Sequence, residues 1–180
     1  MLKTDEALLM VVDIQGKLAR IVHDSESVIA AAGRLIRGAR VLGVPILWTE
    51  QNPEGLGPTV PELAELLPPD GRALPKLHFS CWGDKTIRDA IDEIGRKHIL
   101  LAGIETHVCV YQTAVDLTAA GYGVHVVADA VSSRTPANRE IGLAKVQQAG
   151  AAITCVETAL FEMLQIARGE KFKEILKIVK

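Results

Sequence analysis

Five short runs of apolar residues alternate along this chain with longer amphipathic segments, and this alternation strongly constrains the fold. Each run is continuous, which is typical of strands that helices bury on both faces. The runs are ALLMVV (Ala7–Val12), VPILWT (Val44–Thr49), HILLAGI (His98–Ile104), GVHVVA (Gly123–Ala128) and AAITCV (Ala151–Val156). A shorter run, Ala73–Pro75, could form a further strand just before Lys76.

The segments between these runs have the spacing of amphipathic helices. Apolar residues recur at helical intervals from Ser25 to Val41, and Gly43 and Pro45 then end the helix. We expect further helices over Thr86–Ile94, Thr106–Ala120 and Pro136–Ala149, and one or two over Glu157–Lys180. This alternation predicts an α/β fold with three layers, α/β/α, and a mostly parallel sheet.

Composition narrows the class of protein. With 180 residues, 48% of them hydrophobic, we expect a single domain over residues 1–180 with a sizeable core. The 20 basic and 22 acidic residues are mixed along the chain, so we expect no nucleic-acid partner. The N-terminus has neither the length of a membrane span nor the layout of a signal peptide. Three cysteines without close pairing fit a reducing compartment, so we expect a cytoplasmic protein with no membrane partner.

Polar residues follow several of the expected strands. Asp13 and Gln15 follow the first strand, and Gln51 follows the second. Lys76 follows the short third run, and the next run leads into GIETHVC (Gly103–Cys109). Because ligands bind beyond the carboxyl ends of parallel strands, we expect these residues to converge on one edge of the sheet.

Cys109 has two interpretations. Most free cysteines are small buried hydrophobes, and Cys109 could be one of them. If the Thr106 hydroxyl caps the following helix, however, Cys109 is the third residue of that helix, where unpaired N–H groups and the helix dipole favour a thiolate. Such surroundings can lower a cysteine pKa from about 8.5 to about 3.5–7.5, which suits a nucleophile.

A cysteine nucleophile needs a proton acceptor. His107 is close in sequence, but residues two apart on a helix point in different directions. Asp13 is the better candidate, and Lys76 could hold Asp13 in place and stabilise negative charge. An Asp–Lys–Cys arrangement is therefore plausible on geometry alone.

Three motifs together resemble a known family. VVDIQ around Asp13, LPKLHFSCW around Lys76 and LLAGIETHVCV around Cys109 have the order and spacing of the isochorismatase-like cysteine hydrolases, and the resemblance runs from about Leu8 to Leu160. It implies a Rossmann-like fold and a triad in which Cys109 attacks, Asp13 shuttles the proton and Lys76 orients Asp13. It also implies a cis peptide at Ile104–Glu105 and an oxyanion hole formed by the backbone N–H groups of Glu105 and Cys109.

The segment after the second strand indicates the branch of this family. Nicotinamidase-type members have metal-binding histidines there, whereas no histidine occurs here between His23 and His78. We therefore expect no metal and no other cofactor. The motifs look like the isochorismatase-domain and YcaC-like branch, and the resemblance to the family implies a homo-oligomer.

The sequence thus predicts a cysteine-dependent hydrolase that acts on a small amide or related carbon–nitrogen substrate through an acyl-cysteine. Two alternatives are a ligand-binding or scaffold protein without catalytic activity and a redox sensor based on Cys109. Gln15 and Gln51 could contact substrate or bridge loops, and Trp82 could line the pocket or belong to the core.

Other residues receive simpler interpretations. Asp129 is expected to anchor a loop, and Cys81 and Cys155 are expected to pack in the interior. Tyr111 and His107 could face a subunit interface.

Overall fold

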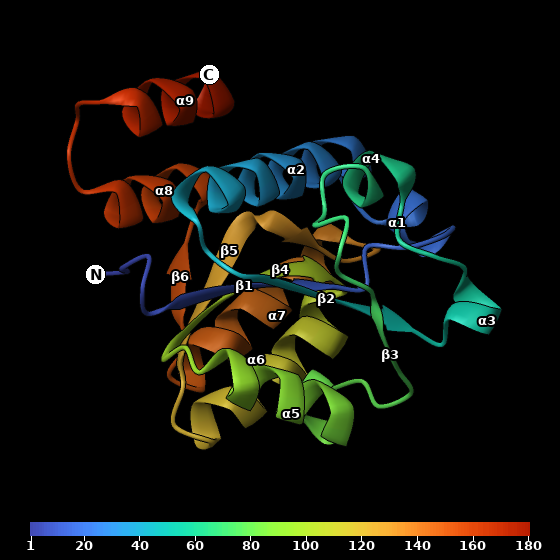
Figure 1. The fold of residues 1–180 in the computed structure, drawn as a ribbon. Helices are drawn as coiled ribbons and strands as arrows, with labels where there is room; N and C mark the ends of the chain where they lie inside the picture. Colours follow the sequence, from blue (N-terminus) through green and yellow to red (C-terminus); the bar gives the residue numbers. More distant parts are fainter.

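The computed structural model describes all residues, 1–180, and is organised around one six-stranded parallel sheet (Figure 1). The strand order is β3-β2-β1-β4-β5-β6, the order of Rossmann-type sheets. The strands are β1 (Ala7–Val12), β2 (Ile46–Gln51), β3 (Leu74–Lys76), β4 (His98–Ile104), β5 (Gly123–Ser132) and β6 (Ala152–Thr154). The predicted α/β class and parallel sheet are confirmed.

Helices cover both faces of the sheet (Figure 1). One face carries α2 (Ser25–Leu42), α8 (Val156–Leu164) and α9 (Glu170–Val179), and α9 packs on α2 and α8. The other face carries α5 (Lys85–Ile94), α6 (Tyr111–Ala119) and α7 (Pro136–Gln148). Three short helices follow the carboxyl ends of β1 and β2: α1 (Leu18–Ile21), α3 (Pro53–Leu56) and α4 (Pro61–Ala64).

The position of β1 in the centre of the sheet explains why its sequence is continuously apolar. All six of its residues are buried, because helices lie on both sides of it. Leu9 and Val11 pack in the core beneath α2, whereas Leu8 and Met10 pack in the core on the α5–α6 side. β1 therefore lacks the alternation of polar and apolar residues that is typical of a strand with one solvent-exposed face.

Several strands differ in length from the predicted apolar runs: β2 continues to Gln51, β3 to Lys76 and β5 to Ser132. β1 and β4 begin and end as predicted. β2 begins later than its run, because the Val44 N–H donates to Ala39 O at the end of α2. β6 is shorter, because Ala151 N–H donates to Val146 O and Cys155 caps α8.

The helix expected over Thr106–Ala120 is divided in two. Thr106–Val110 forms a π-helical segment, η2, and α6 continues from Tyr111. The Val110 N–H donates to Glu105 O, five residues earlier, which is the π-helical pattern. Such bulges occur frequently at functional sites.

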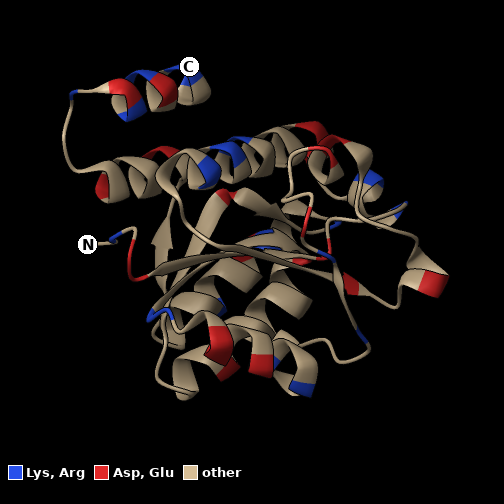
Figure 2. Cartoon of the chain, in the orientation of Figure 1, with Lys and Arg blue, Asp and Glu red and all other residues tan.

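Charged residues lie on the outer helices and in the loops, and most of the sheet is free of them (Figure 2). Lys and Arg are interspersed with Asp and Glu on α2 and α9. No helix has both the length and the apolar character that a membrane span requires.

We predict that Gly103→Ala destabilises the fold strongly. Gly103 has φ +142° in β4, and an added Cβ would lie 2.2 Å from Val12 O on the neighbouring strand. We expect urea unfolding to show a loss of about 2–5 kcal/mol from backbone strain and overpacking. Gly43→Ala is the control, because Gly43 also has positive φ but no neighbour within 4 Å of its Cβ position. Similar losses in both variants would contradict this interpretation.

Candidate active site

The candidate site lies where the strand order reverses. β1 is the first strand in sequence, and its neighbours are β2 on one side and β4 on the other. Asp13 directly follows β1, Lys76 is the last residue of β3, and Cys109 lies in η2 beyond β4. Ligands of open α/β sheets bind at such a switch point.

Asp13 is held by its backbone and by both carboxylate oxygens. Its φ is +54°, a left-handed conformation that aspartate tolerates better than most residues. The Asp13 N–H donates to Thr49 O over 3.2 Å, and the Thr49 hydroxyl donates to Asp13 Oδ1 over 2.8 Å. Oδ2 lies 2.7 Å from Lys76 Nζ. Both side chains of this ion pair are completely buried.

Lys76 is surrounded by oxygen acceptors. Its Nζ donates to Gln51 Oε1 at 2.7 Å and to the main-chain oxygens of His78 and Phe79 at 3.1 Å each. Burial lowers the pKa of Lys76, but the negative charge of Asp13, together with the nearby Cys81 and Cys109, outweighs it and the net pKa is raised. Lys76 therefore remains a cation inside the protein.

The pKa of Cys109 is not lowered, as the sequence had predicted, but raised. Burial, and secondly the charge of Asp13, raise the pKa of its thiol to about 12, and Lys76 offsets only part of this rise. The side chain is nearly enclosed, with 8% of the residue exposed. The expectation of a lowered pKa at a helix N-terminus was wrong, because removal from water and the neighbouring carboxylate outweigh the helix dipole. At neutral pH Cys109 is a neutral thiol.

The predicted cap was also wrong. Glu105, not Thr106, precedes the first helical turn, and Thr106 Oγ1 is buried without a hydrogen-bond partner. Cys109 is consequently the fourth residue of the helical segment rather than the third. The π-helical turn, which apolar periodicity does not reveal, accounts for the difference.

The peptide between Ile104 and Glu105 is cis, as the family resemblance implied. The Glu105 N–H has no main-chain or side-chain partner, which leaves it available as a donor. The Glu105 carboxylate accepts from Arg134 Nε at 2.9 Å and from the Arg134 N–H at 3.3 Å. This pair joins the loop after β4 to the loop after β5.

The two glutamines that were candidates for substrate binding are engaged in internal contacts. Gln15 is fully buried; its Nε2 donates to Gln51 O and Gly57 O at 3.0 and 2.7 Å, and its Oε1 accepts from the Gln51 N–H at 2.7 Å. Gln51 accepts from Lys76 through Oε1 and donates to Leu77 O through Nε2 at 2.9 Å. These contacts favour the bridging alternative for both.

Trp82 favours its packing alternative. Its ring meets Tyr122 edge-on, with 5.6 Å between ring centroids. Tyr122 immediately precedes β5 and so belongs to the amino-terminal edge of the sheet, away from the candidate site.

Thr49 was missed as a site residue, and Cys81 lies closer to the site than its predicted packing role implied. Thr49 and Gln51 alternate along β2, and this spacing alone could have placed both on one face. Cys81 does pack in the interior, but its Sγ lies 3.8 Å from Thr49 Oγ1, and burial and the charge of Asp13 raise its pKa to about 11. It shares a core cluster with Cys109.

The predictions for Asp129 and Cys155 have different outcomes. Asp129 is an anchor, since its Oδ1 accepts from the Val156 N–H at 2.9 Å. Cys155 is half-buried and its sulfur accepts from the Thr158 N–H at 3.5 Å, so it caps α8 rather than filling the core. His107 Nδ1 lies 3.0 Å from Ser133 Oγ.

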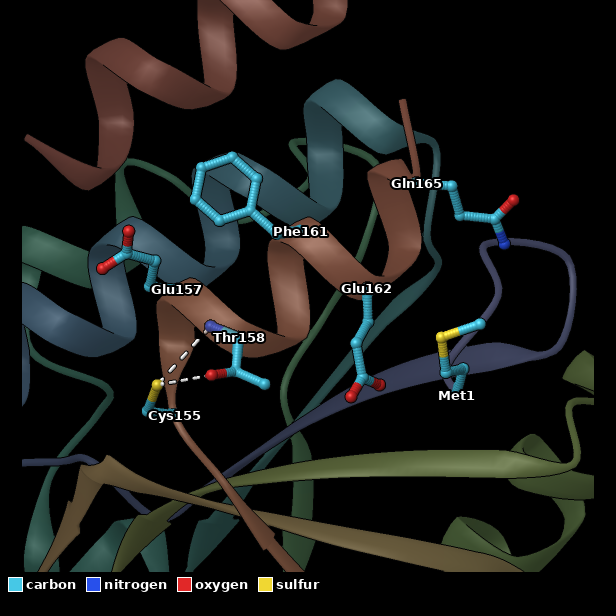
Figure 3. Close-up of a pocket in the computed structure, with 7 residues that line it drawn as sticks. All are labelled: Met1, Cys155, Glu157, Thr158, Phe161, Glu162 and Gln165. Atoms are coloured by element: carbon cyan, nitrogen blue, oxygen red, sulfur yellow. Dashed lines mark hydrogen bonds between the residues drawn. The ribbon is translucent and has the colours of Figure 1, made fainter. Parts of the chain in front are cut away.

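One surface hollow lies apart from these residues. It measures about 680 Å³, and α8, Met1, Cys155 and Gln165 line it (Figure 3). A smaller hollow of about 350 Å³ borders Lys76 and Leu77 on one side and Asn52–Glu54 on the other. No group of three or more histidine, cysteine, aspartate or glutamate side chains is arranged to hold a metal ion.

Sequence comparisons place this chain among known proteins. Residues 6–158 match the Isochorismatase domain family. The chain is 40% identical over 177 residues to the secreted isochorismatase effector Isc1 of Phytophthora sojae, covering 97% of this chain and 84% of that protein. It is 38% identical over 173 residues to isochorismatase domain-containing protein 2 of Xenopus laevis, covering 96% and 83%.

Solved structures share the whole architecture. The MAR1 ribonuclease of Caenorhabditis elegans superposes with a TM-score of 0.92 at 37% identity, covering 99% of this chain and 91% of that one. YcaC of Pseudomonas aeruginosa, in a structure with hexane-2,5-diol and covalent acrylamide, has a TM-score of 0.92 at 27% identity, covering 98% and 90%. Escherichia coli YcaC, described as an octameric hydrolase of unknown specificity, has a TM-score of 0.92 at 25% identity, covering 98% and 88%.

We predict that Thr49→Val lowers the free energy of unfolding by about 1–3 kcal/mol, because Asp13 Oδ1 loses its hydroxyl donor inside the protein. Urea unfolding at neutral pH measures this loss. Thr118→Val is the matched control, since Thr118 Oγ1 is buried without a partner and its removal leaves no group unpaired. Equal losses in the two variants would show that the Thr49–Asp13 bond contributes nothing measurable.

Proposed function

Because this chain belongs to the isochorismatase family of hydrolases, we propose that it hydrolyses small amides or related carbon–nitrogen compounds through an acyl-cysteine on Cys109. The observation that carries the proposal is the buried ion pair between Asp13 and Lys76, with 2.7 Å between Oδ2 and Nζ, beside the Cys109 thiol. A buried ion pair is costly to desolvate and is weak evidence for stability. A catalytic role explains its presence better.

In the proposed first step, Cys109 Sγ attacks the carbonyl carbon while its proton passes to Asp13. A neutral thiol suits this order, because the proton leaves as the carbon–sulfur bond forms. The Lys76 cation compensates the negative charge that Asp13 carries before the transfer. The N–H groups of Glu105 and Cys109 would donate to the developing oxyanion.

In the second step, the protonated Asp13 gives its proton to the leaving nitrogen, so the amine departs and the thioester remains. Asp13 then takes a proton from water, and the hydroxyl attacks the thioester carbon. Collapse releases the carboxylic acid and returns the proton to the Cys109 sulfur. Each proton that Asp13 accepts is given back within the cycle.

Three other functions are considered: RNA cleavage, peroxide sensing and ligand binding without turnover. The similarity to a protein named a ribonuclease makes RNA cleavage the second candidate. Peroxide sensing is disfavoured, because susceptibility to oxidation follows thiolate character and exposure, and Cys109 has little of either. A binding protein without turnover would form no covalent adduct.

We further propose that residues 1–180 act as one domain, as a homo-oligomer, without a metal or cofactor. The octameric E. coli YcaC supports assembly. A cytoplasmic location stays a proposal, and the secreted relative from Phytophthora sojae is the reason to test it.

We predict that wild-type protein incubated with a panel of small amides and activated esters gains the mass of an acyl group on Cys109, measured by intact and peptide mass spectrometry. Cys109→Ala should lose both adduct and turnover, whereas Cys155→Ala should keep both, since Cys155 lies apart from Asp13 and Lys76. Cleavage of RNA oligonucleotides without any adduct would favour the second candidate. Near-normal amide hydrolysis by Cys109→Ala would refute the nucleophile.

We also predict that iodoacetamide alkylates Cys109 slowly at pH 7 and about tenfold faster per pH unit towards pH 10, because the thiol pKa of about 12 lies above this range. In Lys76→Met the rate should fall further, since Lys76 lowers this pKa, and turnover should fall roughly 10²–10⁴-fold. Lys85→Met, at an exposed lysine, is the control. Alkylation of Lys76→Met with the wild-type rate and pH profile would show that Lys76 does not act on the nucleophile.

A further inference from the structure

Glu105 carries one of the two N–H groups proposed to face the oxyanion, and it is held at its carbonyl and at its carboxylate. Its carbonyl oxygen accepts from the Val108 and Val110 N–H groups at 3.0 and 3.2 Å. Its Oε1 accepts from Arg134 Nε at 2.9 Å and from the Arg134 N–H at 3.3 Å. The main-chain position of Glu105 is therefore fixed, while its own N–H is free to bind a substrate oxygen.

The same residue also brings a negative charge to this part of the site. A carboxylate on the residue that donates to an oxyanion repels the charge that develops there. Only 11% of the Glu105 side chain is exposed, so water screens this repulsion weakly. A cation is needed to offset the carboxylate, and Arg134 supplies it.

The main chain at Arg134 is itself anchored beside Glu105. β4 and β5 are paired up to their carboxyl ends, so the chain leaves the sheet at neighbouring points before these two residues. Ser132 Oγ donates to His23 O at 2.5 Å, and Ser133 O accepts from the His23 N–H at 2.8 Å. Both serines are completely buried. Arg134 therefore holds the Glu105 carboxylate from a fixed loop.

We propose that Arg134 is a positioning residue that holds and neutralises the Glu105 carboxylate, so that the Glu105 N–H can stabilise the oxyanion. The inference rests on the proposed function, in which an oxyanion forms when Cys109 attacks a carbonyl carbon. Arg134 acts on this step through Glu105. Without Arg134, an unpaired carboxylate would remain beside the oxyanion and the Glu105 side chain would lose the bond from Nε.

The test follows three reactions in Arg134→Met, in Arg134→Lys and in the double variant Glu105→Gln/Arg134→Met. They are hydrolysis of the amide or ester found with the wild type, binding of ¹³C-labelled acetaldehyde to Cys109 followed by NMR, and alkylation by iodoacetamide. Arg20→Met is the matched control. Arg20 also pairs with a glutamate, Glu62, at 2.8 and 2.9 Å, in short helices of the other loops.

The first two reactions need the oxyanion hole, and the third does not. With acetaldehyde, the Cys109 sulfur bonds to the carbonyl carbon while the thiol proton passes through Asp13 to the carbonyl oxygen. The resulting hemithioacetal places its oxygen where the oxyanion would lie. In alkylation the sulfur displaces iodide from a CH₂ carbon and gives up its proton, so no oxyanion forms.

For Arg134→Met we expect kcat to fall about tenfold or more, with KM within about twofold of wild type. The Kd for acetaldehyde should rise about tenfold or more, while the alkylation rate stays within about twofold. Adding Glu105→Gln should recover about threefold or more of kcat, because no unpaired charge then remains. Arg20→Met should match wild type in all three reactions.

An unchanged Kd for acetaldehyde in Arg134→Met would overturn the proposal. Equal slowing of alkylation and hydrolysis would overturn it too, because it would show a general loss of site structure. A raised KM with unchanged kcat would assign Arg134 to substrate binding instead. No recovery in the double variant would refute the neutralising role.

Two further results keep the test decisive. If Arg134→Met fails to fold, Arg134→Lys decides alone, because lysine keeps the charge but not the Nε geometry. A Kd for acetaldehyde raised about threefold or more, with wild-type alkylation, is then expected, and wild-type values in both would overturn the proposal. Failure of the proposed hydrolysis appears separately, as absent turnover in a wild type whose binding of acetaldehyde can still be compared with that of the variants.

Discussion

The contact between Lys76 and Asp13 is the interaction on which the candidate site depends. Two opposite charges 2.7 Å apart, both fully buried, are tolerable only together, because either alone would face a large desolvation penalty. Their surroundings are arranged accordingly: Thr49 supplies a donor to the anion, while Gln51 and two main-chain carbonyls supply acceptors to the cation. β2, the strand between β1 and β3, thereby holds both Asp13, which follows β1, and Lys76, which ends β3.

The Cys109 thiol is neutral mainly because it is buried, and secondly because the Asp13 carboxylate is close to it. A nucleophilic cysteine is usually explained by a lowered pKa, but here burial and the adjacent carboxylate raise it to about 12. In the proposed mechanism, the proton would therefore leave Cys109 while the sulfur attacks, and no thiolate would be present beforehand. A neutral resting thiol has a further benefit, since it reacts slowly with stray electrophiles and oxidants.

The strands and two of the site residues could be predicted from the sequence, because they depend on short stretches of neighbouring residues. Continuous apolar runs identified β1 and β4 to the residue, and the polar residues after the strands identified Asp13 and Lys76. The π-helical turn at Thr106–Val110 could not be predicted, because it depends on how Glu105 O is shared between two N–H groups. The roles of Gln15 and Gln51 could not be predicted either. A glutamine amide can form hydrogen bonds with a substrate or with a loop, and only the three-dimensional structure shows which partners it has.

Lys76 belongs to the outermost strand, which has only three residues and is paired along one side. Edge segments of this kind open more readily than the interior of a sheet, in local fluctuations that leave the rest of the fold intact. An excursion of β3 would withdraw the cation and expose an uncompensated Asp13 to water. Under the proposed mechanism, activity would therefore depend on the local opening free energy of this edge strand, which is smaller than the free energy of global unfolding. Hydrogen-exchange rates at the margin of the sheet would then follow activity more closely than the melting temperature does.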